Sequence, residues 1–323
     1  MPVNYQPGYQ SPAYLYTGHL QTILPALFRR VGNVHYRRER IVTDDNDFLD
    51  LDWSTPNNSN HLVIISHGLE GDSCRPYVLG MVRALNLKGS DVLAWNYRGC
   101  SGEANKQIRS YHSGFTSDLH YVIQHVLAKQ QYDSLYLLGF SVGGNITLKY
   151  LGEQKFTIPS EVRCAVNFSV PCNLETTAYH LARFRSKIYM QRFIKSLTSK
   201  LKEKDKLFPG TLDLSKLGAI KNFYQFDSQY TAPMFGYKSA KAYWQENSSI
   251  HYIKNITLPT LIVSAANDPF LTKECFPISE AEKKSNILLE IPATGGHCGF
   301  YEANSEGIYW SEKRAIEFIG NYI

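Results

Sequence analysis

The sequence predicts an α/β fold with a mainly parallel central sheet flanked by helices. From about residue 40 to 171, short apolar runs alternate with longer stretches of helical periodicity, which is typical of β-α-β units. The 323 residues are 43% hydrophobic and 20% charged, enough to bury a large core, so disordered and fibrous classes are excluded. Apolar runs resume after residue 258, and we expect a single domain over residues 1–323.

The expected elements follow in chain order. Short apolar runs predict strands, and longer stretches with apolar residues at helical spacing predict helices. The expected strands are His61–Ser66, Asp91–Tyr97, Ser134–Leu138, Val162–Phe168, Pro259–Ser264 and Asn286–Ile291. The expected helices are Pro76–Leu87, Gly114–Lys129, Gly143–Leu151 and about Tyr309–Ile319.

Two segments depart from the alternation. Residues 1–37 show little periodicity and contain three prolines before residue 13, so we expect an extended N-terminal arm lying on the core. Residues 172–250 are polar, helix-prone and rich in aromatics, which indicates an inserted helical cap.

A basic stretch lies within this cap. Residues 183–206 hold nine Lys or Arg against Glu203 and Asp205, a local charge of +7 beside +5 for the whole chain. Two apolar stripes of different phase predict two short helices or a kink; they are Leu181, Phe184 and Ile188, and Phe193, Leu197 and Leu201. The favoured interpretation is a cap with its basic side in water. The alternative is weak contact with an anionic membrane surface or an acidic partner.

Composition excludes several other classes. A net charge of +5 is too small to indicate a nucleic-acid partner. No run approaches the roughly 18 apolar residues of a membrane span, and residues 1–10 do not resemble a secretory signal, so we expect a cytoplasmic protein. The six cysteines contain no Cys-x-x-Cys pair or metal-ligand cluster. We expect reduced thiols, no metal and no cofactor, and the sequence leaves the oligomeric state open.

A serine between glycines is the first candidate for chemistry. Gly139-Phe-Ser141-Val-Gly143 fits G-x-S-x-G and lies between an expected strand and an expected helix, which is the context of a nucleophile elbow. Glycines permit the sharp turn and leave room for a substrate carbonyl. We therefore expect Ser141 to be a nucleophile. A phosphate cradle is disfavoured because no lysine follows as in a P-loop.

A serine nucleophile needs a general base and a carboxylate that orients the base. His297 lies in a glycine-rich loop after the last expected strand, and Asp268 follows the strand before it, held extended by Pro269. The chain order Ser141, Asp268, His297 is that of α/β-hydrolases. Cys298, directly beside the base, is disfavoured as an alternative nucleophile.

Two backbone N–H groups are expected to form an oxyanion hole. One belongs to Val142, directly after the nucleophile. The other belongs to Leu69, in His67-Gly-Leu-Glu-Gly71 after an early strand.

These motifs together resemble the YheT-like branch of the α/β-hydrolases. The resemblance covers nearly the whole chain and rests on the following segments: Gly18–Ile23, His67–Gly71, Asn96–Gly102, Tyr111–Gly114 with Asp118, Gly139–Asn145, Phe235–Tyr237, Ser248-Ser249, Asn267–Phe270 and Gly295–Phe300. It implies a serine esterase or lipase-like enzyme, in a group that includes medium-chain fatty-acid ester synthases and membrane-anchored phospholipid hydrolases. It also implies a catalytic triad of Ser141, Asp268 and His297. His19, Gln21 and His112 belong to the pattern, and we favour structural roles for them.

We expect a serine carboxylic ester hydrolase that acts on a short- to medium-chain, small-molecule acyl ester through an acyl-enzyme. Phe235 and Tyr237 are the expected substrate-binding residues, although the aromatics of the cap fit its own core equally well. Acyl transfer to an alcohol instead of water is the alternative, and a non-catalytic binding protein on the same fold is a weaker one.

Overall fold

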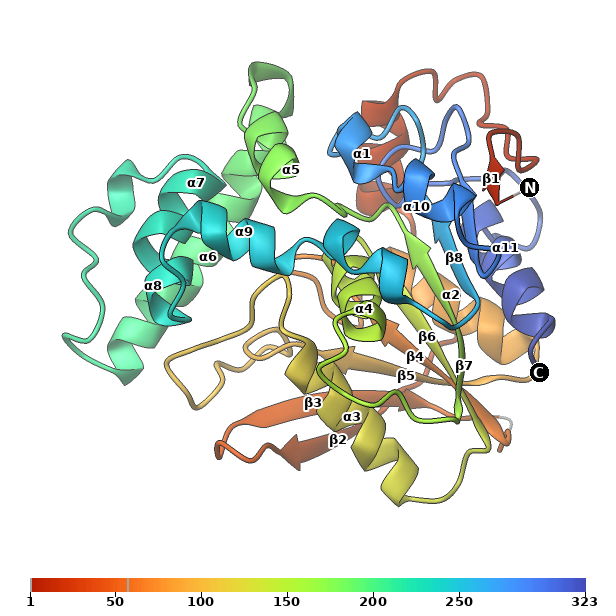
Figure 1. Ribbon diagram of the computed structural model, residues 1–323, viewed down its shortest axis with the longest axis horizontal. Coiled ribbons are helices and arrows are strands. Elements are labelled where there is room, and N and C mark those ends of the chain that lie inside the picture. The colour runs from red at the N-terminus through yellow and green to blue at the C-terminus, as the bar shows by residue number, and fades with distance from the viewer. Residues whose placement is uncertain (1, 57) are drawn as a thin grey trace.

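The computed structural model describes residues 2–56 and 58–323. In this part of the chain nine strands form one sheet, in the order β1-β9-β8-β7-β6-β4-β5-β3-β2 (Figure 1). The pairs of β3 with β2 and β5 are antiparallel, and the other pairs are parallel. The strands are β1 Val3–Asn4, β2 Arg37–Val42, β3 Phe48–Ser54, β4 His61–Ser66, β5 Asp91–Asn96, β6 Ser134–Phe140, β7 Val162–Phe168, β8 Thr260–Val263 and β9 Ile287–Glu290.

Helices cover both faces of the sheet, and the predicted α/β class is confirmed. α2 (Pro76–Leu87) and α11 (Trp310–Gly320) bury their apolar sides against one face. α3 (Thr116–Ala128), α4 (Val142–Gly152) and α10 (Ile278–Glu282) pack on the other. These helices and the parallel strands lie within a residue or two of their predicted bounds wherever the sequence predicted them.

The first two long strands were not predicted. β3 is buried at every position, yet it contains Asp50 and Asp52, which interrupt the apolar pattern. Each carboxylate receives two hydrogen bonds from an arginine of the edge strand β2, Arg40 to Asp50 and Arg38 to Asp52, at 2.7 to 2.8 Å. Because this pairing satisfies the buried charges, a strand forms although the two aspartates interrupt its apolar pattern.

The N-terminal arm is not extended throughout. Residues Gly18–Phe28 form helix α1, whose first turn is capped by the Thr17 side chain accepting from the N–H of Leu20. Short strand β1, at the start of the arm, extends the sheet beside β9. Pro25 lies inside α1, where a proline lacks the backbone N–H of a helical hydrogen bond, and this obscured the helix in the sequence. The helix forms nonetheless, with Gly18, Gln21 and Thr22 buried against the core.

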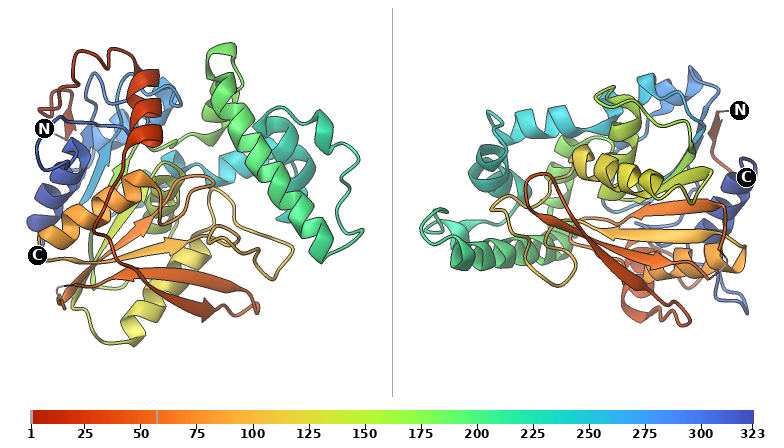
Figure 2. Two further views of the ribbon diagram at one scale, coloured as in Figure 1. Left: turned by 180° about the vertical axis from the view of Figure 1, so that it is seen from behind. Right: turned by 90° about the horizontal axis from the view of Figure 1, so that it is seen from below.

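Residues Leu174–Asn247, here called the helical segment, lie beside the sheet and not within it (Figure 2). Its elements are α5 Leu174–Leu181, η1 Phe184–Ser186, α6 Lys187–Leu207, η2 Leu217–Ala219, α7 Phe223–Phe226, the π-helical turn η3 Asp227–Thr231, α8 Ala232–Met234 and α9 Ala240–Asn247. The short 3-10 turns η4 Ser249–His251 and η5 Ile253–Asn255 lead back to β8, and η6 Lys273–Cys275 follows β8.

The expected pair of short helices over the basic stretch is wrong. α6 is one helix of 21 residues, and the two stripes differ in phase because Leu181 ends α5 and Phe184 lies in the turn η1. An apolar stripe on a packed helix would be buried. Phe184 and Ile188 are instead 89% and 64% exposed.

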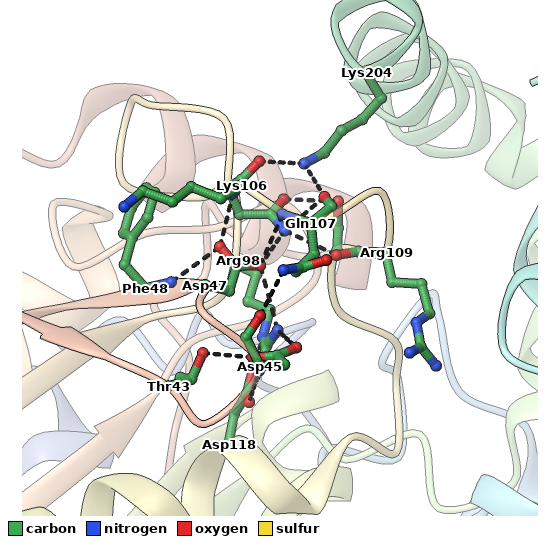
Figure 3. A network of polar contacts seen from close by, with 12 residues as sticks. Thr43, Asp45, Asp47, Phe48, Arg98, Lys106, Gln107, Arg109, Asp118 and Lys204 are labelled. Atoms are coloured by element: carbon green, nitrogen blue, oxygen red, sulfur yellow. Dashed lines mark hydrogen bonds and ion pairs between the residues drawn. The ribbon is translucent and has the colours of Figure 1, made fainter. Parts of the chain in front are cut away.

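The far half of α6 is anchored to the sheet domain. Lys204 donates hydrogen bonds to the backbone carbonyls of Asn105 and Gln107 (Figure 3). That loop is held in turn by Asp47, which receives the Asn105 side-chain amide and lies 3.2 Å from Arg98. Burial lowers the pKa of Lys204 to about 8. Lys204 therefore has a structural role, in contrast to the exposed basic residues at the start of α6.

Candidate active site

Ser141 lies on a tight turn between β6 and α4. Its φ of 53° is positive, a conformation that side-chain-bearing residues adopt only under constraint. Its N–H donates to the carbonyl of Phe168, 2.8 Å away, which fixes the turn to the next strand. A Cβ at Gly143 would clash with the carbonyl of Ser66, so glycine is required for α4 to approach β4.

The structure brings Ser141, His297 and Asp268 together from three loops. His297 Nε2 lies 2.9 Å from Ser141 Oγ, and His297 Nδ1 lies 2.8 Å from Asp268 Oδ2. The Asp268 side chain is fully buried and also accepts the N–H of Phe270 at 2.8 Å. The Phe270 ring stacks on the imidazole at 3.9 Å between centroids. This geometry is that of a nucleophile, a base and a group that orients the base.

Helix α1 holds the loop that carries His297. Gln21 Oε1 accepts the N–H of Gly295 at 2.7 Å and the side-chain amide of Asn267 at 2.9 Å. Thr22 Oγ1 accepts the N–H of His297 itself at 2.8 Å. Gln21 is buried, so its amide has no water to replace these partners. The arm thus positions the imidazole, a role that the sequence alone did not assign to Gln21.

We expect Gln21→Ala to lower kcat roughly 10- to 100-fold with little change in KM. The substitution leaves the Gly295 N–H buried and unpaired, which costs about 1–3 kcal/mol, and the loop relaxes away from Ser141. Steady-state kinetics on a soluble ester measure the split between kcat and KM. The conservative variant Gln21→Glu, which keeps the acceptor oxygen, restores part of kcat. An equal loss in both variants, accompanied by a fall in Tm, would indicate a purely structural residue.

The two backbone groups proposed for the oxyanion hole flank Ser141. The N–H of Val142 is at the first position of α4, where no intrahelical acceptor exists. The N–H of Gly68 donates to the Tyr77 hydroxyl and that of Glu70 to the Tyr111 hydroxyl, whereas the N–H of Leu69 between them has no acceptor within the described residues. Leu69 and Val142 also line a cavity together with Ser141.

The oxyanion loop is tied to α6 through the Glu70 carboxylate. Lys200 Nζ lies 2.9 Å from Glu70 Oε1, the Tyr111 hydroxyl donates to the same oxygen, and Ser196 donates to the other. Glu70 itself has a positive φ of 54°. Movement of α6 is therefore coupled to the backbone beside Leu69, a connection with no local sequence signal because the partners are more than 100 residues apart.

Two cavities meet at Ser141. The α5 cavity, about 110 Å³, lies under the helical segment and is mostly apolar. The α1 cavity, about 380 Å³, lies between α1 and the first half of α6 and includes Arg75 and Arg192. Leu69, Ser141, Phe193, Phe270 and His297 line both. A substrate bound at Ser141 can therefore extend in two directions.

Phe235 and Tyr237 are not among the residues lining the α5 cavity. Their rings contact His112, which does line it, at 4.6 and 5.9 Å between centroids, and Phe235 lines a separate cavity of about 60 Å³. Among the other cap aromatics, Phe223 and Phe226 do line the α5 cavity.

Two titratable side chains in the wall of the α5 cavity, His112 and Asp227, have pKa values shifted by burial. Burial lowers the pKa of His112 to about 3, so its imidazole is uncharged. Burial raises the pKa of Asp227 to about 6, although its carboxylate accepts hydrogen bonds from Thr231 and from the Trp244 indole. The sequence favoured a structural role for His112, with site lining as the alternative, and gave no signal for Asp227. Burial also raises the pKa of the Cys298 thiol, which makes a thiolate nucleophile unfavourable.

The family model described as alpha/beta hydrolase fold matches residues 61–304. The chain belongs to the α/β-hydrolase family. It is 32% identical over 311 residues to "Putative esterase YheT" of Escherichia coli (strain K12), covering 94% of this chain and 91% of that protein, so the resemblance to YheT-like α/β-hydrolases is confirmed. It is 30% identical to "Phospholipase ABHD3" of Mus musculus, covering 87% of this chain and 70% of that protein.

Solved structures show the same fold. The Pyrococcus furiosus esterase Pf2001 superposes with a TM-score of 0.59 at 19% identity, covering 91% of this chain and 98% of the esterase. With relatives named esterase and lipase, this α/β-hydrolase is an enzyme of the carboxylic ester hydrolase type. Within residues 2–56 and 58–323, no helix is both long and apolar enough to cross a membrane. No cluster of three or more potential metal ligands occurs in those ranges either.

Proposed function

We propose that the protein hydrolyses short- to medium-chain acyl esters through a Ser141-His297-Asp268 triad. His297 takes the Ser141 proton as the hydroxyl attacks the ester carbonyl, and then gives it to the leaving alkoxide. Asp268 fixes the tautomer and stabilises the imidazolium, while the N–H groups of Leu69 and Val142 stabilise the oxyanion. Water, activated by His297 in the same way, releases the acid. The observation that carries the proposal is the continuous chain of contacts at 2.8 and 2.9 Å from Asp268 to Ser141.

The positions of the two cavities support one orientation of the ester. The leaving alkoxide must be next to His297, because that imidazole protonates it. The α1 cavity extends past His297 and Cys298, whereas the α5 cavity extends past Val142 and Pro171, on the side of the elbow. We therefore assign the acyl chain to the α5 cavity and the alcohol to the α1 cavity.

The domain organisation belongs to the same proposal. Residues 1–323 act as one catalytic domain, with residues 1–37 as an arm and about 172–250 as a cap. The arm is supported by the bonds from Gln21 and Thr22 to the His297 loop. The cap is supported by the α5, α6 and α7 residues that line the α5 cavity.

A matched pair of substitutions tests the orientation. Ala178 lines the α5 cavity and Ala26 lines the α1 cavity. Ala178→Phe fills much of the smaller space, so we expect the acyl-chain optimum to fall by several carbons and kcat/KM for longer acyl esters to drop at least ~10-fold, with acetate esters little affected. Ala26→Phe leaves that optimum in place and instead disfavours acetate esters of bulky alcohols.

The measurement is kcat/KM over p-nitrophenyl esters of increasing acyl length and over acetate esters of increasing alcohol size. If Ala26→Phe instead shortened the accepted acyl chain and Ala178→Phe restricted the alcohol, the ester would bind in the opposite orientation. Tm of both variants serves as the control for folding.

A further inference from the structure

Four large apolar side chains are exposed at the rim of the α1 cavity. Leu27 and Phe28 end α1 and are 52% and 69% exposed, and Phe184 in η1 and Ile188 in the first turn of α6 are 89% and 64% exposed. Leu27 and Ile188 both line the cavity, so these two segments, distant in sequence, border the same opening. Helix α1 and the start of α6 both lie in the upper part of the molecule in Figure 1 and in the left view of Figure 2. We call these four residues and the cations around them the docking face.

The chain segments that carry these apolar groups contain positively charged side chains and no carboxylates. No Asp or Glu precedes Glu39, and none lies between Glu175 and Glu203. The exposed cations of the face are Arg30, Arg183, Arg185, Lys187 and Arg192. Within the described ranges none of them forms an ion pair with a carboxylate, in contrast to the inward-pointing Lys200.

Helix stability does not account for this arrangement. Arg183, Arg185 and Lys187 lie immediately before or at the first turn of α6, which has no acidic residue. Positive charge at a helix N-terminus opposes the helix dipole and is unfavourable. Exposed aromatic and aliphatic groups among unpaired cations are also unfavourable for a surface that faces only water, and such clusters mark interaction sites.

We propose that the docking face binds the surface of an anionic phospholipid bilayer, with its apolar side chains entering the interface and its cations contacting lipid phosphates. Apolar side chains at interfacial depth together with a basic rim are what peripheral attachment requires. A second copy of the chain is a poorer occupant, because two such faces would bring like charges together. The α1 cavity, and through it Ser141, would open directly onto the lipid. Binding at this face does not require hydrolytic activity, so it can be tested apart from the proposed function.

Vesicle sedimentation tests the face directly. The full chain is mixed with vesicles of phosphatidylcholine alone or with one third phosphatidylglycerol, at low and high salt. We expect binding to the anionic vesicles only, weakening with salt as screening increases. Each Lys or Arg near an anionic surface contributes roughly fivefold in affinity, so Arg183→Gln/Arg185→Gln/Lys187→Gln reduces binding ~100-fold. Loss of one inserted ring in Phe184→Ala reduces it roughly tenfold.

Matched controls lie at the other end of the segment. Lys202→Gln/Lys206→Gln/Lys216→Gln removes the same charge, and Leu207→Ala removes another exposed apolar group, 54% exposed, about 30 Å along α6. Both retain vesicle binding. Hydrolysis of a soluble acetate ester by Phe184→Ala and by the arginine-lysine triple variant stays at the unmodified level, which separates docking from catalysis.

Several results would overturn the proposal. Binding unaffected by the triple variant, or equally reduced by its control, would show that this face is not the contact. No binding to anionic vesicles would exclude the lipid surface. A dimer in gel filtration that Phe184→Ala converts to monomer, without vesicle binding, would assign the face to a second copy instead.

Discussion

Replacing Ser141 by alanine abolishes ester hydrolysis, lowering kcat by roughly 10⁶-fold. Without Oγ no acyl-enzyme forms, and only binding and the oxyanion donors remain to accelerate attack by water. The substitution removes one oxygen from a turn fixed by backbone contacts, so the fold persists. The measurement is hydrolysis of the p-nitrophenyl ester series by both proteins, with Tm as a check on folding.

The control for this result is the thiol beside the base. Cys298→Ala keeps the Ser141 to His297 contact and therefore retains activity far above that of Ser141→Ala. If Cys298→Ala lost activity while Ser141→Ala kept it, the nucleophile would be the Cys298 thiol and not the Ser141 hydroxyl.

Asp268→Asn lowers kcat by about 10⁴-fold while binding is largely kept. The carboxylate accepts from His297 Nδ1 and so places the lone pair of Nε2 toward Ser141. An asparagine amide presents a donor to Nδ1, which puts the proton on Nε2, and that nitrogen then cannot accept the serine proton. The measurement is kcat and KM on the ester that the unmodified enzyme hydrolyses best.

Glu274→Gln is the matched control, since this exposed carboxylate is on the turn that follows Asp268. We expect it to keep full activity. If Asp268→Asn lost no more than a few-fold, another group would be orienting the imidazole, and the account of this carboxylate would be wrong.

The chemistry-bearing residues could be predicted because their positions relative to strands carry the signal. Ser141 has a local motif between a strand and a helix, and Asp268 and His297 each follow a strand in the expected order. The structure places all three in contact, but their catalytic roles are tested only by the variants above. The loop of Leu69 was predictable for the same reason, since it directly follows β4.

The supporting contacts could not be predicted, because they join residues far apart in sequence. Gln21 accepts from Gly295 across 274 positions, and Glu70 meets Lys200 across 130. No periodicity or spacing records such pairs. β3 was missed for a related reason, because its buried aspartates depend on arginines of a neighbouring strand. Phe235 and Tyr237 were predicted from aromatic character alone; in the fold both rings contact His112, and their part in substrate binding stays a prediction.

The most direct test of the triad is covalent labelling by a fluorophosphonate, which reacts with a serine activated by a neighbouring base. Mass spectrometry of the labelled, digested protein identifies the modified residue. The account predicts one label per chain on the peptide that contains Ser141, absent in Ser141→Ala and strongly slowed in His297→Ala. A label on another residue, or an enzyme that hydrolyses esters at full rate after complete treatment without labelling at Ser141, would contradict it.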